Sequence, residues 1–93
     1  MTLSLTPSER KKFRGQAMNM NIAVIIGKAG VTDAVIKTLN LALKKDGLIK
    51  IRLIAPDKPT RKTWLEEIVN RTESAICGEV GHTASIYRPK ESE

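Results

Sequence analysis

Two glycines three positions apart, with a lysine between them, are the strongest indication of chemistry in this sequence. The loop that they bound consists of Gly27, Lys28, Ala29 and Gly30. Glycines at both ends let the backbone turn tightly and approach a ligand without a Cβ in the way. A predicted helix follows, whose first backbone amides, at residues 31–33, favour an anion, and Lys28 adds a mobile positive charge. This GXXG loop predicts a contact to the phosphates of a nucleic-acid backbone.

An ordinary strand-to-helix turn is the alternative interpretation of this loop. Residues 78–81 repeat the glycine spacing, but they carry an acid, precede no helix and lie in a predicted hairpin, so we interpret them as turn residues. The GXXG loop also lacks the longer glycine-rich segment, ending in Lys-Ser or Lys-Thr, of sites that hydrolyse nucleotides. We therefore expect no ATP, GTP or other cofactor.

Basic side chains form three further groups that could contact RNA. The first predicted helix carries four within five positions, Arg10, Lys11, Lys12 and Arg14. In the second predicted helix, a polar face holds Asp33, Lys37, Asn40 and Lys44. Lys50 and Arg52 lie on one face of a predicted strand. With the GXXG loop, the predicted RNA-binding residues are Arg10, Lys11, Arg14, Lys37, Lys44, Lys50 and Arg52; a solvated surface is the alternative for each group.

Candidates for catalysis or metal binding are few. His82 is the only histidine and falls in a predicted hairpin turn. Cys77 could approach it across the hairpin, but no third residue is evident to orient such a pair. Glu66 and Glu67 are adjacent on a predicted helix and therefore diverge. We expect neither an enzyme nor a metal site.

Composition supports a small basic domain. The chain has 93 residues, enough for one domain, and its 16 Lys and Arg against 10 Asp and Glu give a net charge of +6, which suits a polyanionic partner. Phe13, Trp64 and Tyr87 are the only aromatic residues, so a base-stacking platform is not expected and backbone contacts are favoured.

Several features predict a cytoplasmic protein without a membrane partner, and we expect a monomer. The longest apolar run, residues 22–26, is too short to span a bilayer, and residues 1–12 do not resemble a secretory signal. The lone cysteine agrees with a reducing compartment. We expect one domain over residues 1–93, with a frayed tail at residues 90–93.

Three helices and four strands are predicted. A capping box begins the first helix, at residues 7–18, and Thr32 caps the second, at residues 33–45, before Gly47. After a loop at residues 56–59, a third helix has an apolar stripe, Trp64, Leu65, Ile68, Val69 and Thr72. Its outer face carries Arg61, Lys62, Glu66 and Glu67, which we interpret as self-neutralised and solvated.

The predicted strands differ in burial. Residues 22–26 are wholly apolar, as in a strand covered on both faces, whereas residues 48–53 alternate, as in a strand with one exposed face. Residues 75–80 and 83–88 form a hairpin around Gly81 and His82. The order α-β-α-β-α-β-β implies a small two-layer α/β sandwich, with a mixed four-stranded sheet and a right-handed parallel crossover between the first two strands.

The ordered set of segments resembles one known family. The segments are Leu5-Thr6-Pro7 before a basic helix, residues 24–32 around the GXXG loop, residues 48–51, residues 80–83, and Ile86-Tyr87-Arg88-Pro89. Together they resemble the chloroplast RNA splicing and ribosome maturation (CRM) domain, whose stand-alone bacterial form is the YhbY family. Residues 15–21 depart from the family's pattern, which has alanine, histidine and leucine followed by Lys-Pro.

The resemblance implies a fold like the C-terminal domain of translation initiation factor three. It also implies that the GXXG loop and the neighbouring basic surface contact RNA. For bacterial members it implies association with precursors of the large ribosomal subunit, and plant relatives act in group II intron splicing. We therefore expect ribosomal RNA as the partner; an adaptor that binds an acidic protein is the alternative.

Overall fold

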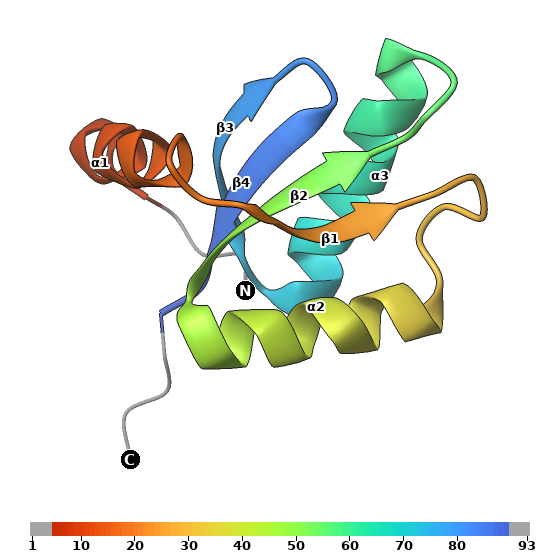
Figure 1. The fold of residues 1–93 in the computed structure, drawn as a ribbon, viewed down its shortest axis with the longest axis horizontal. Coiled ribbons are helices and arrows are strands. Elements are labelled where there is room, and N and C mark those ends of the chain that lie inside the picture. The colour runs from red at the N-terminus through yellow and green to blue at the C-terminus, as the bar shows by residue number, and fades with distance from the viewer. Residues whose placement is uncertain (1–4, 90–93) are drawn as a thin grey trace.

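The predicted order of helices and strands is confirmed (Figure 1). The structure is a computed structural model that describes residues 5–89, so the predicted frayed tail lies outside the described residues. The helices are α1 (Pro7–Ala17), α2 (Asp33–Asp46) and α3 (Lys58–Thr72), and the strands are β1 (Ile22–Ile26), β2 (Leu48–Leu53), β3 (Ala75–Val80) and β4 (Thr83–Tyr87). Within residues 5–89, no helix is long and apolar enough to cross a membrane.

Side-chain caps determine where the helices begin. Thr6 and Glu9 form the predicted capping box of α1, and Thr32 caps α2. The third helix begins within the segment predicted to be a loop, because Asp57 accepts a hydrogen bond from the backbone N–H of Thr60 at 2.8 Å. Pro59 is compatible with this start, since a proline in the first turn of a helix loses no intrahelical hydrogen bond.

The sheet has the strand order β1-β2-β4-β3. The β1 and β2 strands are parallel and are connected through α2, as predicted, whereas β4 pairs with β2 and β3 in the antiparallel sense. The hairpin turn has Gly81 at φ 58°, a conformation that favours glycine. The predicted mixed four-stranded sheet is therefore confirmed.

One face of the sheet carries the hydrophobic core. Helices α2 and α3 cover this face, and the fully buried side chains include Leu39, Leu43, Leu65, Ile68, Ile49, Ile51 and Ile86. On β2 and β4 these core residues alternate with Lys50 and Ser85, which point to the opposite face. The sheet with α2 and α3 makes up the predicted sandwich.

Helix α1 packs on the opposite face of the sheet. The Phe13 ring stacks on that of Tyr87, with centroids 4.1 Å apart and an interplanar angle of 15°. The aliphatic part of Arg14 lies on Gly78, where a Cβ would come within 2.7 Å of Arg14 Cδ. Helix α1 contacts β3, β4 and β2, so it covers only part of this face.

The prediction that β1 is covered on both faces is wrong. It is an edge strand, and Ile26 is its only buried residue. Ile25 is 57% exposed because it points to the face of α1, away from the α2 and α3 side that Ile26 meets. An apolar composition alone did not reveal that a helix covers only one side of β1.

Candidate nucleic-acid interface

The GXXG loop forms a hydrogen-bonded turn between β1 and α2. The backbone N–H of Gly30 donates to the carbonyl oxygen of Gly27 at 2.9 Å, and Gly30 has φ +74°. Lys28 and Ala29 are exposed at the tip of the turn. Among the described residues, neither donates a backbone hydrogen bond to another backbone group. The loop therefore presents two amides and one ammonium group to solvent.

The two glycines have different surroundings. A Cβ at Gly30 would lie 3.2 Å from Cζ2 of Trp64, so the indole of α3 lies directly against this residue. A Cβ at Gly27 would have no atom of the described chain within 4 Å. Gly30 is thus required by the protein itself, whereas the open space at Gly27 allows an external group to approach the backbone.

The N-terminus of α2 is already partly neutralised by an acid. Thr32 accepts a hydrogen bond from the N–H of Val35 at 3.2 Å, which satisfies one of the amides of the first turn. Asp33 begins the helix, and its carboxylate pairs with Arg71 at 2.6 Å. Because the Asp33 carboxylate makes the helix end less attractive to an anion, the amides of the loop and Lys28 offer an anion more favourable contacts than the helix end does.

The hairpin turn and the start of α3 lie at the same end of the sheet as the loop. The backbone N–H of Leu53, the last residue of β2, donates to the carbonyl oxygen of His82 at 2.7 Å. Nη1 of Arg61 lies 3.2 Å from Nδ1 of His82, which accepts its hydrogen bond. No local sequence pattern relates Arg61 to His82, because the two residues are 21 positions apart and meet only in the tertiary structure.

The charges of α3 differ from the predicted self-neutralised face. Arg71 forms salt bridges with Glu67, at 3.4 Å, and with Asp33. Arg61 is not purely solvated, because it contacts His82 in the hairpin turn. Both salt bridges among the described residues involve Arg71, so Lys62 and Glu66 do not form one. The four-residue spacing permits such a pair but does not require it.

The structure brings together some of the predicted basic residues. Arg14 and Lys50 line one groove on the sheet face that α1 covers in part. Arg52 follows Lys50 by two residues on β2 and therefore lies on the same face. It pairs in register with Ile25, which is two residues before the GXXG loop. Arg10, Lys11 and Lys12 are exposed on α1 itself.

The basic residues of α2 lie apart from this group. Helix α2 covers the other face of the sheet, and Lys44 is in its last turn, 11 residues and about 16 Å along the axis from Asp33. Asn40 lies on the same polar face, and its side-chain oxygen accepts a hydrogen bond from Arg88 at 2.9 Å. Lys37 and Lys44 are exposed, but the structure does not join them to Lys50 and Arg52.

Cys77 is a core residue. Its side chain is fully buried, and burial raises the pKa of its thiol to about 11. A thiol that stays protonated at neutral pH is a poor nucleophile. Among residues 5–89, no group of three or more His, Cys, Asp or Glu side chains is arranged to hold a metal ion.

Comparison with known proteins identifies relatives along the whole described chain. A Haemophilus influenzae protein named "RNA-binding protein" is 30% identical over 88 residues, which cover 95% of this chain and 89% of the relative. The Bacillus subtilis protein named "Probable RNA-binding protein YqeI" is 26% identical over 84 residues, 90% of this chain and 88% of the relative. The solution structure of a hypothetical protein from Staphylococcus aureus superposes with a TM-score of 0.85 at 26% identity, covering 96% of this chain and 93% of that chain.

The model of the CRS1 / YhbY (CRM) domain matches residues 5–88, which include the GXXG loop and every other predicted RNA-binding residue. The names of the relatives describe RNA binding and no enzymatic activity. The chain therefore belongs to the CRS1 / YhbY (CRM) domain family.

Proposed function

We propose that this protein binds RNA and that its target is ribosomal RNA in precursors of the large ribosomal subunit. The naming of relatives as RNA-binding proteins supports the first part. The resemblance of its motifs to the bacterial YhbY proteins supports the second part. It implies that the protein acts in ribosome assembly. The protein acts as a monomer in the cytoplasm and catalyses no reaction.

The geometry of the GXXG loop is the observation that carries this proposal. Its exposed tip offers the Lys28 ammonium and two backbone amides, and no atom of residues 5–89 fills the space at Gly27. A phosphate group needs hydrogen-bond donors and positive charge, and a sugar-phosphate backbone needs room to approach. The loop supplies all three without a base-specific contact.

The remaining affinity comes from the basic face formed by α1 and β2. Arg14, Lys50 and Arg52 lie on the side of the sheet that α1 leaves partly open. If roughly four to six phosphates are neutralised, the logarithm of the association constant falls with the logarithm of salt concentration at a slope of about −3 to −5. A salt-independent affinity would contradict this mode of binding.

The test compares a change in the loop with the same change far from it. Lys28→Glu places a negative charge where the proposal places a phosphate, and we expect RNA affinity to fall at least about tenfold at low salt. The control is Lys45→Glu, because Lys45 is exposed in the last turn of α2, at the far end from the loop. Lys28→Glu should lower the unfolding free energy by no more than about 0.5 kcal/mol, and Lys45→Glu by about 0.5–1 kcal/mol, because it places an acid at the C-terminal end of α2.

The cellular counterpart is sedimentation of each variant with precursors of the large subunit. We expect Lys45→Glu to travel with these particles and Lys28→Glu to remain near the top of the gradient. Equal RNA affinity of both variants would make the loop a simple turn. Binding to an acidic protein, with no affinity for RNA alone, would favour the adaptor function instead.

A further inference from the structure

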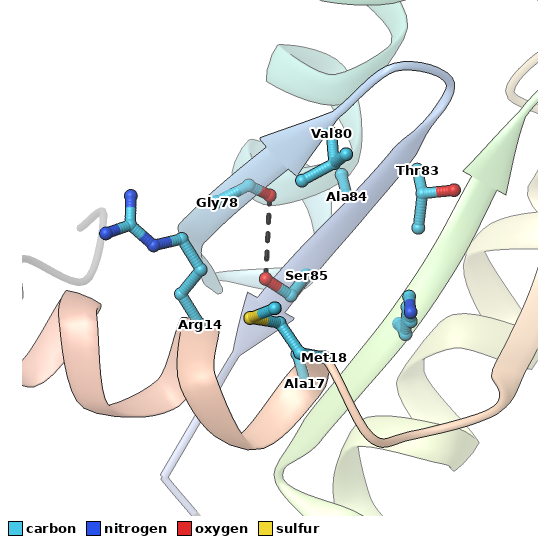
Figure 2. A pocket seen from close by; sticks show the side chains of 9 residues that line it. Arg14, Ala17, Met18, Gly78, Val80, Thr83, Ala84 and Ser85 are labelled. Carbon is cyan, nitrogen blue, oxygen red and sulfur yellow. Dashed lines mark hydrogen bonds between the residues drawn. The ribbon is translucent and has the colours of Figure 1, made fainter.

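A groove lies between the C-terminal end of α1 and the β3–β4 hairpin (Figure 2). Its volume is about 260 Å³. The floor is the sheet face opposite the core, where Gly78, Ser85 and Lys50 form one row across three strands. Thr83 and Val80 continue the floor toward the hairpin turn, and α1 forms the wall.

The groove is open because α1 stops before it crosses the whole sheet. The helix ends at Ala17, which is buried against the floor, and Met18 follows as its cap. Met18, at the end of α1, and Val80, on the floor toward the hairpin, are each 74% exposed (Figure 2). Two large apolar side chains therefore face water beside a concave surface, which is typical of a binding site.

Lys50 gives the groove its charge. It lies on the central strand β2 and is only partly exposed, in contrast to Arg52 two residues later. Both salt bridges among the described residues involve Arg71, so no carboxylate there neutralises Lys50. A partly buried lysine beside apolar side chains favours a ligand that brings hydrogen-bond acceptors or negative charge.

We propose that this groove binds one unpaired nucleotide of the RNA. The proposal rests on the proposed function. It makes the groove a second place where the protein contacts RNA, in addition to the GXXG loop. The base packs on Met18 and Val80, and the Lys50 ammonium and the Thr83 hydroxyl contact its polar edge or its phosphate. The volume is just below that of sites for drug-sized ligands, which suits a single base with its sugar.

Charge favours RNA over an apolar peptide as the occupant. Arg14 lies along the rim, with its aliphatic part on Gly78 and its guanidinium directed away from the floor (Figure 2). Arg52 lies in the next row of the same face, paired in register with Thr83. A rim with two cations beside Lys50 attracts a polyanion, and single-stranded segments of RNA can insert an unstacked base.

The experiment uses two RNA hairpins that differ by one nucleotide. One has a fully paired stem, and the other carries a single bulged uridine in the same stem. The test variant is the double change Met18→Ser and Val80→Ser, which removes apolar contact and leaves net charge unchanged. Leu41→Ser is the matched control, since Leu41 is 63% exposed on α2, on the other side of the molecule.

We expect the unaltered protein to bind the bulged hairpin more tightly than the paired one. The double variant should lose at least about fivefold in affinity for the bulged hairpin and less than about twofold for the paired hairpin. Leu41→Ser should resemble the unaltered protein with both RNAs. Photo-crosslinking from 4-thiouridine at the bulge should map to the peptides that contain residue 18 or residues 80–83.

Other outcomes separate the two proposals. The groove proposal would be overturned if the unaltered protein bound both hairpins with equal affinity. It would also be overturned if the double variant lost the same affinity for both hairpins. Either result would leave the proposal of RNA binding in place. Failure of the unaltered protein to bind either hairpin would overturn the proposed function and this inference together. If the double variant melts early, Lys50→Met provides the second test, and it should also reduce the preference for the bulge.

Discussion

The indole of Trp64 lies against Gly30, so that a Cβ on Gly30 would be 3.2 Å from Cζ2 of the ring. Trp64 belongs to α3 and Gly30 to the loop before α2, 34 positions earlier in the chain. This contact supports the GXXG loop from below, on the side away from the exposed tip. It gives the two glycines of the loop different roles, which substitution can separate.

Alanine at each glycine should give opposite results. Gly30→Ala forces a Cβ against Trp64 at φ +74°, which should lower the unfolding free energy by about 1–2 kcal/mol. The added methyl group of Gly27→Ala has no atom of the part of the chain that the structure describes within 4 Å, so this change should leave stability unchanged. We expect Gly27→Ala to weaken RNA binding at least about tenfold, because the methyl group occupies space that the RNA backbone needs.

Urea denaturation and RNA titration of both variants check this prediction. If Gly27→Ala binds RNA as tightly as the unaltered protein, the open space at Gly27 has no part in binding.

Arg88 should be a structural residue despite its positive charge. Its guanidinium donates to the side-chain oxygen of Asn40 and the carbonyl oxygen of Thr72, both at 2.9 Å, and to the carbonyl oxygen of Asn40 at 3.2 Å. These bonds connect the end of β4 to α2 and α3. Arg88→Lys cannot reproduce the planar fork, so we expect a loss of about 1–3 kcal/mol in unfolding free energy.

Thermal and urea melts of Arg88→Lys measure this loss, and Lys45→Ala is the control that should change stability by less than about 0.5 kcal/mol. The RNA affinity of the folded fraction should stay the same. A normal melt with weakened RNA binding would instead place Arg88 in the interface.

Cys77 should be unreactive in the folded protein. Because burial raises the pKa of its thiol to about 11, the thiolate that reacts with disulfide reagents is scarce at pH 8. We expect labelling by dithiobis(nitrobenzoic acid) to be slow in buffer and fast in urea. Cys77→Ala should keep RNA binding, and rapid labelling of the native protein would contradict the burial of this thiol.

The cap of α3 should make stability depend on pH at the acid end. The Asp57 carboxylate accepts hydrogen bonds from Thr60, which lowers its pKa below the ordinary value of 3.8. The charged form is therefore favoured by folding, so its stabilising effect is present above about pH 3.8 and is lost as pH falls through the lowered pKa. Asp57→Asn keeps an acceptor but loses the charge.

Melting temperatures between pH 2 and pH 7 provide the measurement. We expect the unaltered protein to melt above Asp57→Asn at pH 7, with a difference that shrinks toward pH 2. A difference that grows on acidification would show that the charge of Asp57 opposes folding.

Local patterns in the sequence determined the helices, the strands and most of their boundaries. The Thr6 and Thr32 caps act within three residues, and the alternation of Ile49, Lys50 and Ile51 describes β2 without reference to other strands. The GXXG loop was also evident, because its glycines, its lysine and the following helix are adjacent in the chain. Such features depend on backbone propensity and short-range hydrogen bonds, which residues within one turn control.

Only the tertiary structure decided which residues of these elements come into contact. The apolar residues of β1 suggested burial, yet its place at the sheet edge leaves Ile25 exposed. The contact of Trp64 with Gly30, the bond between Arg61 and His82, and the groove beside Met18 all join residues far apart in sequence. Their physical basis is the packing of whole helices on a sheet, which depends on which strand pairs with which and where each helix stops.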